Sequence, residues 1–250
     1  MPFPIRRLAL AAAIAPLALA TAACGDKTPT AGPSGEPVAK VAPPAGKAWT
    51  EVVSKTAEGG YRMGNPDAPV KLVEYGALSC SHCGEFAKES ADKLLNDYVA
   101  SGRVSYELRF FMLNAFDVPA TLLATCGSNE AVIPLSEQFW AWQPTMFSNL
   151  QAVGDAKLQQ AAALPPSQRL QAIAQLAGMT DFFSSRGISR DQGAACLADT
   201  AKADVLAKQT ETASTKYNVT GTPSFFLNDA PVGTADWKTL ETKLQAAGAR

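Results

Sequence analysis

The chain has 250 residues, of which 47% are hydrophobic and 18% are charged. This composition excludes a chain that is disordered throughout and predicts one sizeable core or two small ones. The formal net charge is -1 and the Lys and Arg residues are scattered, so the basic surface that would bind the phosphates of nucleic acid is not expected.

The first 23 residues have the pattern of an export signal. Arg6 and Arg7 form a basic start, residues 8–20 form an apolar run, and small residues follow. The run is shorter than the roughly 20 residues that a transmembrane helix needs. We therefore expect residues 1–23 to be a signal peptide and the mature chain to work in the periplasm, an oxidising compartment.

Cys24 directly follows Thr21, Ala22 and Ala23, and this pattern resembles the cleavage box of bacterial lipoproteins. By that resemblance Cys24 becomes the lipidated first residue, and the lipid is the expected attachment to a membrane. Leucine is usual where this chain has Thr21, so cleavage after Ala22 or Ala23 without lipidation is the alternative. Residues 24–47 are rich in Pro, Gly, Ala and Thr, bury little apolar surface and are predicted to be a disordered tether.

Residues 48–250 are predicted to fold, and their first half alternates between strand and helix patterns. The predicted elements are a strand at 49–53, a turn at 64–69, a strand buried on both faces at 70–75, a helix at 83–99 that Gly102 ends, and a strand at 104–112. This order is β-α-β, and it places Cys80 and Cys83 at the start of the first helix.

The next stretch, at about 115–200, is predicted to be a helical insertion, because helical patterns recur in it and no convincing strand does. The patterns lie at 119–126, 137–150, 168–177, 191–198 and 201–217, and Pro144 predicts a kink or break in the second of them. Strand signals return at 224–227, followed by a turn at 228–229, a short strand at 231–233 and a last helix at 236–247.

The sequence Cys80-Ser81-His82-Cys83 carries the predicted chemistry. Two thiols at this spacing can close a small disulfide ring at a helix N-terminus, where unpaired N–H groups and the helix dipole stabilise a thiolate on the first sulfur. His82 can add a hydrogen bond or a positive charge. A more stable thiolate makes the disulfide a stronger oxidant. Cys80 is therefore predicted to be the sulfur that attacks and leaves in the exchange with a substrate, and Cys83 the resolving sulfur.

The same residues argue against a metal or haem site. A c-type haem site needs a histidine where this chain has Gly84. A zinc site needs four ligands, and His82 is the one histidine, so Cys126 and Cys196 would have to be recruited from distant helices. The single histidine also argues against copper. We expect no metal and no organic cofactor, and an inert structural disulfide is the remaining alternative.

The number of the remaining cysteines suggests how they pair. If Cys24 is lost to lipid or cleavage and Cys80 pairs with Cys83, an even pair remains, Cys126 and Cys196. In an oxidising compartment we expect these two to form a structural disulfide, with two buried free thiols as the alternative.

Pro223 lies directly before a predicted strand, an unusual place for proline, and is the second feature, after the Cys80–Cys83 motif, that indicates function. Together with residues 64–70, residues 73–75 and the Cys80–Cys83 motif, the segment 219–226 resembles the DsbA family of thioredoxin-fold proteins in order and spacing. The resemblance covers nearly everything from about Gly60 onwards. It implies an α/β, thioredoxin-like fold with an inserted helical domain.

The resemblance also implies roles for single residues. Pro223 would be a cis-proline that faces the cysteine pair, and the backbone of Thr222 would pair with an extended substrate segment. Glu74 would be the acid beneath the active site that helps to move the Cys83 proton, and a solvent-facing position on an edge is the alternative. Trp140 and Trp142 match an aromatic helix of the family, with core packing as their expected role.

The expected function is therefore an exported thiol-disulfide oxidoreductase. A dithiol oxidase is preferred, one that introduces disulfides into reduced or unfolded envelope proteins and is reoxidised by a membrane redox partner. Ser81 stands where the best-known oxidases of the family have proline, which leaves a reductase or isomerase as one alternative. A tethered module that binds peptides or acts as a chaperone without catalysis is the other.

Overall fold

The computed structural model describes Met1 and residues 35–250. The predicted signal peptide, Cys24 and the first part of the predicted tether lie outside the described residues. The strands are β1 (Val53–Lys55), β2 (Tyr61–Gly64), β3 (Val70–Gly76), β4 (Val104–Phe110), β5 (Ser224–Leu227) and β6 (Ala230–Gly233).

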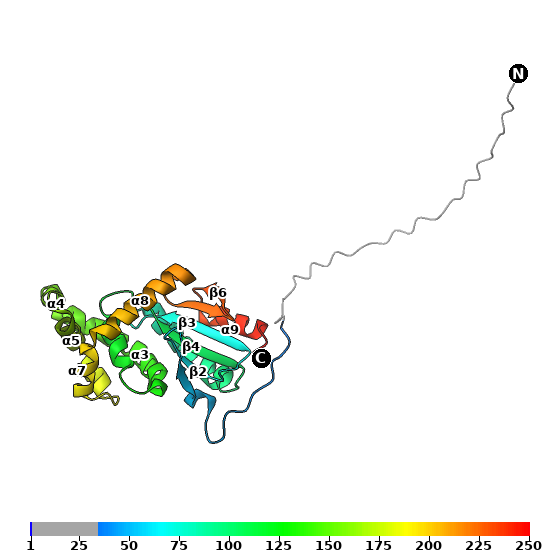
Figure 1. Cartoon of the computed structure of the whole chain (residues 1–250), viewed down its shortest axis with the longest axis horizontal. Coiled ribbons are helices and arrows are strands. Elements are labelled where there is room, and N and C mark those ends of the chain that lie inside the picture. The colour runs from blue at the N-terminus through cyan, green and yellow to red at the C-terminus, as the bar shows by residue number, and fades with distance from the viewer. Residues whose placement is uncertain (2–34) are drawn as a thin grey trace. The chain divides into compact units, whose positions relative to one another are not determined.

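Helices precede, connect and follow these strands (Figure 1). The α-helices are α1 (Ser81–Lys93), α2 (Asp117–Ala124), α3 (Asn129–Val153), α4 (Asp155–Ala162), α5 (Pro166–Leu176), α6 (Met179–Ser184), α7 (Arg190–Ala198), α8 (Thr200–Tyr217) and α9 (Trp237–Ala246). A 3-10 turn η1 (Trp49–Glu51) precedes β1, and a π-helical segment η2 (Leu94–Val99) continues α1.

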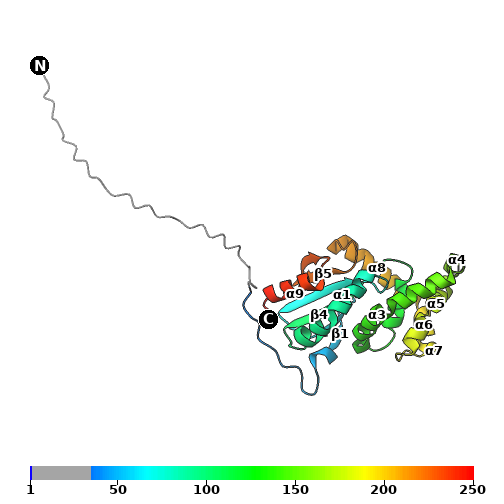
Figure 2. The same cartoon turned by 180° about the vertical axis from the view of Figure 1, so that it is seen from behind.

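The strands form one sheet in the order β1-β2-β4-β3-β5-β6, in which only β3 and β4 run parallel. Side chains alternate along β3, so Val73 and Tyr75 pack with Ala213 of α8 on one face. Leu72 and Glu74 point to the opposite face, where α1 and α9 lie (Figure 2). The alternation thus places Glu74 beneath the helix that begins after Cys80.

Helices α2–α7 form the predicted insertion between the two halves of the sheet (Figure 1). The expectation of a thioredoxin-like α/β fold with an inserted helical domain is confirmed by this topology. Pro144 does not break α3, which runs through it from Asn129 to Val153. Buried side chains on both sides of the proline, Trp140 and Met146, hold the helix against the core.

The prediction of a strand at 49–53 is wrong. Residues 49–51 form η1, where a Glu51 carboxylate oxygen accepts a hydrogen bond from the Ala48 N–H at 2.7 Å, and the strand β1 begins only at Val53. This local bond favours a turn over an extended chain. Strand β2 was not predicted; its last residue, Gly64, falls in the turn predicted at 64–69.

Residues 35–41, which the composition assigned to the tether, lie against the folded domain, and we call them the strap. The Gly35 N–H donates to Ala246 O at 2.9 Å, and the Val41 N–H donates to Ser101 O at 3.0 Å. The indole N–H of Trp49 donates to Val41 O at 2.7 Å. The strap thereby contacts the end of α9 and the turn that follows η2.

Candidate active site

Cys80 is the N-cap residue of α1. Its backbone is extended, and its sulfur accepts a hydrogen bond from the Cys83 N–H at 3.2 Å, as the oxygen of a capping serine would. Cys80 is 6% exposed and Cys83 is fully buried, and both are free thiols in the structure. The first sulfur is therefore the accessible one of the pair.

The two thiols have opposite acidities. A hydrogen bond from the Cys83 thiol, helped by the backbone N–H groups of Cys83 and His82, lowers the pKa of Cys80 to about 6 in spite of its burial. Burial raises the pKa of Cys83 well above its ordinary value. At neutral pH Cys80 is therefore a thiolate while Cys83 keeps its proton.

The Thr222–Pro223 peptide bond is cis and lies against Cys80. In its protonated form the Cys80 thiol donates a hydrogen bond to the carbonyl oxygen of Thr222 at 3.3 Å. Strand β5 begins one residue after Pro223 and pairs with the end of β3, with Ser224 opposite Tyr75. This pairing brings Thr222 and Pro223, about 140 positions away in sequence, to the cysteine pair.

His82 stands apart from the sulfur. Its side chain is exposed and lines a groove of about 240 Å³ with Pro223 and Phe86. Within the described part of the chain, no hydrogen bond joins its imidazole to Cys80. The contribution of His82 to the thiolate comes instead from its backbone N–H.

Glu74 is fully buried, which excludes the solvent-facing alternative. The phenol of Tyr106 donates a hydrogen bond to one of its carboxylate oxygens at 2.8 Å, and the other oxygen has no hydrogen-bond partner in the described residues. Burial, helped by the charge of Cys80, raises the pKa of Glu74 to about 8. A carboxyl group with this pKa can hold or release a proton at neutral pH beneath the two sulfurs.

The insertion holds the loop that leads to Cys80. The carboxylate of Asp117 accepts hydrogen bonds from the Ser79 N–H at 2.7 Å and the Ser79 hydroxyl at 2.9 Å. It also accepts the N–H groups of Leu113 and Asn114, at 2.9 and 3.0 Å. One buried carboxylate thus joins the residue before Cys80 to the start of the insertion.

Side chains of helix α3 donate hydrogen bonds to carbonyl groups of the same loop. The indole N–H of Trp140 donates to Ala77 O at 2.9 Å, and the amide of Gln143 donates to Leu78 O at 2.6 Å and Cys80 O at 3.0 Å. Sequence reasoning assigned Trp140 to packing and missed Gln143. The one available signal was a glutamine one turn after a tryptophan in a helix that is otherwise apolar there.

A family model described as thioredoxin matches residues 56–246, which is most of the chain. The chain belongs to the thioredoxin family. The solved structure of a protein-disulfide isomerase from Novosphingobium aromaticivorans is 32% identical, with a TM-score of 0.72, over 76% of this chain and 98% of that one. Wolbachia pipientis alpha-DsbA1 is 20% identical, with a TM-score of 0.57, over 76% and 92% of the two chains, and shows the same fold.

Curated relatives of this thioredoxin-family protein include several from Rickettsia. A Rickettsia bellii protein, provisionally named a protein-disulfide oxidoreductase, is 23% identical over 71% of this chain and 60% of its own length. A Rickettsia conorii protein with the same provisional name is 23% identical over 82% of this chain and 65% of its own length. The chain therefore spans less than two thirds of the length of these relatives.

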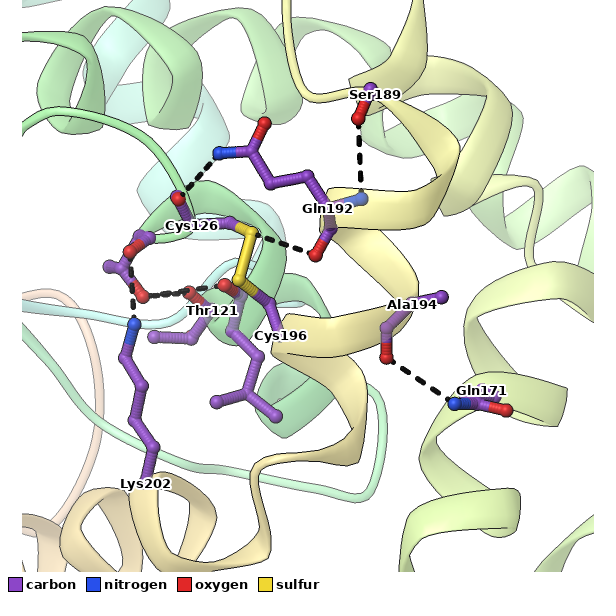
Figure 3. The surroundings of a disulfide bond; sticks show 10 residues. Thr121, Cys126, Gln171, Ser189, Gln192, Ala194, Cys196 and Lys202 are labelled. Carbon is purple, nitrogen blue, oxygen red and sulfur yellow. Dashed lines mark hydrogen bonds between the residues drawn. A yellow bond between two sulfur atoms is a disulfide. The ribbon is translucent and has the colours of Figure 1, made fainter.

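The other two cysteines, Cys126 and Cys196, form a disulfide with their Cα atoms 5.9 Å apart (Figure 3). The bond joins the end of α2 to α7, and the side-chain amide of Gln192 donates to Cys126 O beside it at 2.9 Å. The described residues contain no group of three or more His, Cys, Asp or Glu side chains that could hold a metal ion. Among them, no helix is long and apolar enough to cross a membrane.

Proposed function

We propose that the chain is an exported dithiol oxidase that introduces disulfides into reduced or unfolded envelope proteins. The observation that carries this proposal is the contrast within the cysteine pair. A thiolate on Cys80, stabilised at a helix N-terminus and placed against Thr222 and Pro223, is a good leaving group. Cys83 lies buried behind it.

The reaction starts from the oxidised enzyme, in which Cys80 and Cys83 are joined. A substrate thiolate attacks the sulfur of Cys80, the bond between the two enzyme sulfurs breaks, and its electron pair goes to Cys83. A second substrate thiolate then attacks the substrate sulfur of the mixed disulfide, and Cys80 leaves as a thiolate. Two electrons have moved from the substrate to the enzyme, and the substrate holds a new disulfide.

Glu74 and Thr222 support these steps. The sulfur of Cys83 needs a proton when it leaves, because burial disfavours its thiolate, and the protonated carboxyl of Glu74 can supply it. The backbone of Thr222 borders the reactive sulfur and can pair with an extended substrate segment. Both roles are those that the family resemblance implied.

The cellular setting belongs to the same proposal. The signal pattern at 1–23 supports export to the periplasm, and Cys24 supports attachment to a membrane by a lipid. A membrane redox partner would accept the two electrons and restore the disulfide. Mass spectrometry of the mature N-terminus tests the anchor: a diacylglycerol group on Cys24 is expected, and an unmodified N-terminus would remove it from the proposal.

The redox equilibrium of the Cys80–Cys83 couple with glutathione tests the direction of the reaction. An oxidase requires a couple that glutathione reduces readily, whereas a strongly reducing couple like that of thioredoxin would contradict the proposal. Cys80→Ser should abolish oxidation of a reduced, unfolded protein. Unchanged oxidation by this variant would instead favour a binding module without catalysis.

Isomerase activity is the second candidate, because the 32% identical Novosphingobium protein is described as a protein-disulfide isomerase. Ser81 also occupies the dipeptide that sets the redox poise. A substrate with scrambled disulfides separates the two activities. An isomerase recovers the native pairing with the enzyme in its reduced form, whereas an oxidase acts only in its oxidised form.

A further inference from the structure

A second groove lies beside the active-site loop, on the other side of α1 from Pro223. It has a volume of about 840 Å³ and runs between α1 and α3 from Ser81 to Asp92. Its walls are largely apolar and include Ala87, Ala91, Trp140, Ala141 and Pro144. The two grooves share one wall residue, Glu85, so they are separate surfaces on either side of the reactive cysteine.

Glu137 of α3 lies in the wall of this second groove without a partner. Its side chain is half-buried, and among the described residues it makes no hydrogen bond and no ion pair. Burial alone raises its pKa to about 7. A carboxylate that loses water and gains no partner is unfavourable, and a cation brought by a ligand would compensate for this loss.

Acidic residues also outnumber basic ones among the other charged side chains of the groove. Glu85 and Asp92 add two carboxylates on α1, and Lys88 is the one basic residue of the wall. The groove is therefore apolar along its length and acidic in its net charge. A segment with apolar side chains and one cation complements both properties.

We propose that this groove receives an extended segment of the substrate protein and that Glu137 binds a Lys or Arg side chain of that segment. The inference rests on the proposed function, since it concerns the substrate of the same cysteine pair. Substrates in which a basic residue lies near the reactive cysteine are then preferred.

The dimensions of the groove set the position of the basic residue. The stretch of α1 from Ser81 to Asp92 is about 16 Å long at roughly 1.5 Å per residue. An extended chain covers this length with about five residues at roughly 3.3 Å each. Because the groove begins next to Cys80, the basic residue is expected within about five positions of the substrate cysteine.

Peptide oxidation by the full, oxidised chain tests the proposal. The substrates are reduced two-cysteine peptides with Lys at each of the five positions on either side of the attacking cysteine, matched by peptides with Gln or Glu there. At low salt we expect at least one Lys position to be oxidised about tenfold faster than its Gln match. High salt should remove most of the difference, because it screens the ion pair.

Variants assign the preference to Glu137. Glu137→Gln should slow the preferred Lys peptide to the rate of its Gln match and leave the Gln peptide unchanged. Glu137→Lys should instead favour the Glu peptide. Glu130→Gln, an exposed acid two turns earlier on the same helix, is the matched control and should keep the Lys preference.

Two results would overturn the inference. One is equal oxidation of Lys, Gln and Glu peptides by the unaltered chain at every position. The other is an equal slowing of all peptides by Glu137→Gln, which would mean that this acid supports the active site itself, for example through the proton of Glu74. The Gln peptides report the oxidase reaction alone, because they carry no charge for Glu137 to bind. If the proposed function is wrong, the unaltered chain will oxidise every peptide slowly. This failure is therefore distinguishable from a failure of the inference without the variants.

Discussion

The side-chain amide nitrogen of Gln143 lies 3.0 Å from the carbonyl oxygen of Cys80, so a helix of the insertion holds the backbone of the residue that carries the reactive thiol. The same nitrogen donates to Leu78 O at 2.6 Å. The insertion therefore takes part in shaping the active site and does more than enlarge the domain.

Gln143→Ala is expected to raise the pKa of Cys80 and to make the couple less oxidising. Without the amide, two buried carbonyls lose a donor, the loop loosens, and the contacts from Cys83 that stabilise the thiolate weaken. The ultraviolet absorbance of the thiolate against pH measures the change, and the loss of stability should be about 1–3 kcal/mol. Gln151→Ala, at an exposed glutamine of the same helix, is the control. A pKa equal in both variants would show that Gln143 has no influence on the sulfur.

Glu74→Gln should change how stability depends on pH. In the folded chain the pKa of Glu74 is about 8 against an ordinary value of 4.5, so between these pH values the folded form keeps a proton that the unfolded form has lost. The free energy of unfolding of the unaltered chain therefore falls as pH rises through this window, by an amount on the order of 5 kcal/mol from this group. The variant should lack this component.

Urea unfolding at several pH values measures the contribution of Glu74. The contribution is the difference in the free energy of unfolding between the unaltered chain and Glu74→Gln. Taking the difference cancels the similar contributions of Asp117 and Glu137, whose pKa values burial also raises. Parallel pH profiles for both proteins would show that Glu74 is ionised in the folded state.

The Cys126–Cys196 disulfide should matter for stability and little for the reactive pair. It closes a loop of 70 residues, and its removal in Cys126→Ser/Cys196→Ser is expected to cost about 4 kcal/mol by the loss of chain-entropy restriction. The pKa of Cys80 should not change, because the bond joins α2 and α7 away from α1. A double variant with unchanged stability but an altered Cys80 would reverse these assignments.

Trp49→Phe should release the strap. It removes the 2.7 Å bond from the indole to Val41 O but keeps an aromatic ring in the core. We expect a loss of about 1 kcal/mol and faster hydrogen exchange at the Val41 N–H, which donates to Ser101 O. Exchange as slow as in the unaltered chain would mean that other contacts hold the strap.

Sequence reasoning recovered what depends on local pattern. The strand at 70–75 and the helix after Cys80 follow from periodicity, and the ordered motifs led to Glu74 and Pro223. It could not find Gln143, Asp117 or Glu137, because their roles depend on which helix packs against the active-site loop. It misjudged residues 49–53, where a side-chain bond overrides the tendency of the chain to extend.

The strap also decides where the protein can be attached to something else. Gly35 bonds to Ala246, so both ends of the described domain meet at one region, which Figures 1 and 2 show beside α9. From there to Cys80 lies the length of α1 and η2, about 28 Å for residues 81–99 at roughly 1.5 Å each. A fusion partner or a solid support joined at either end would therefore leave the reactive thiol open, and the two ends are close enough for a short linker to make a circularly permuted form.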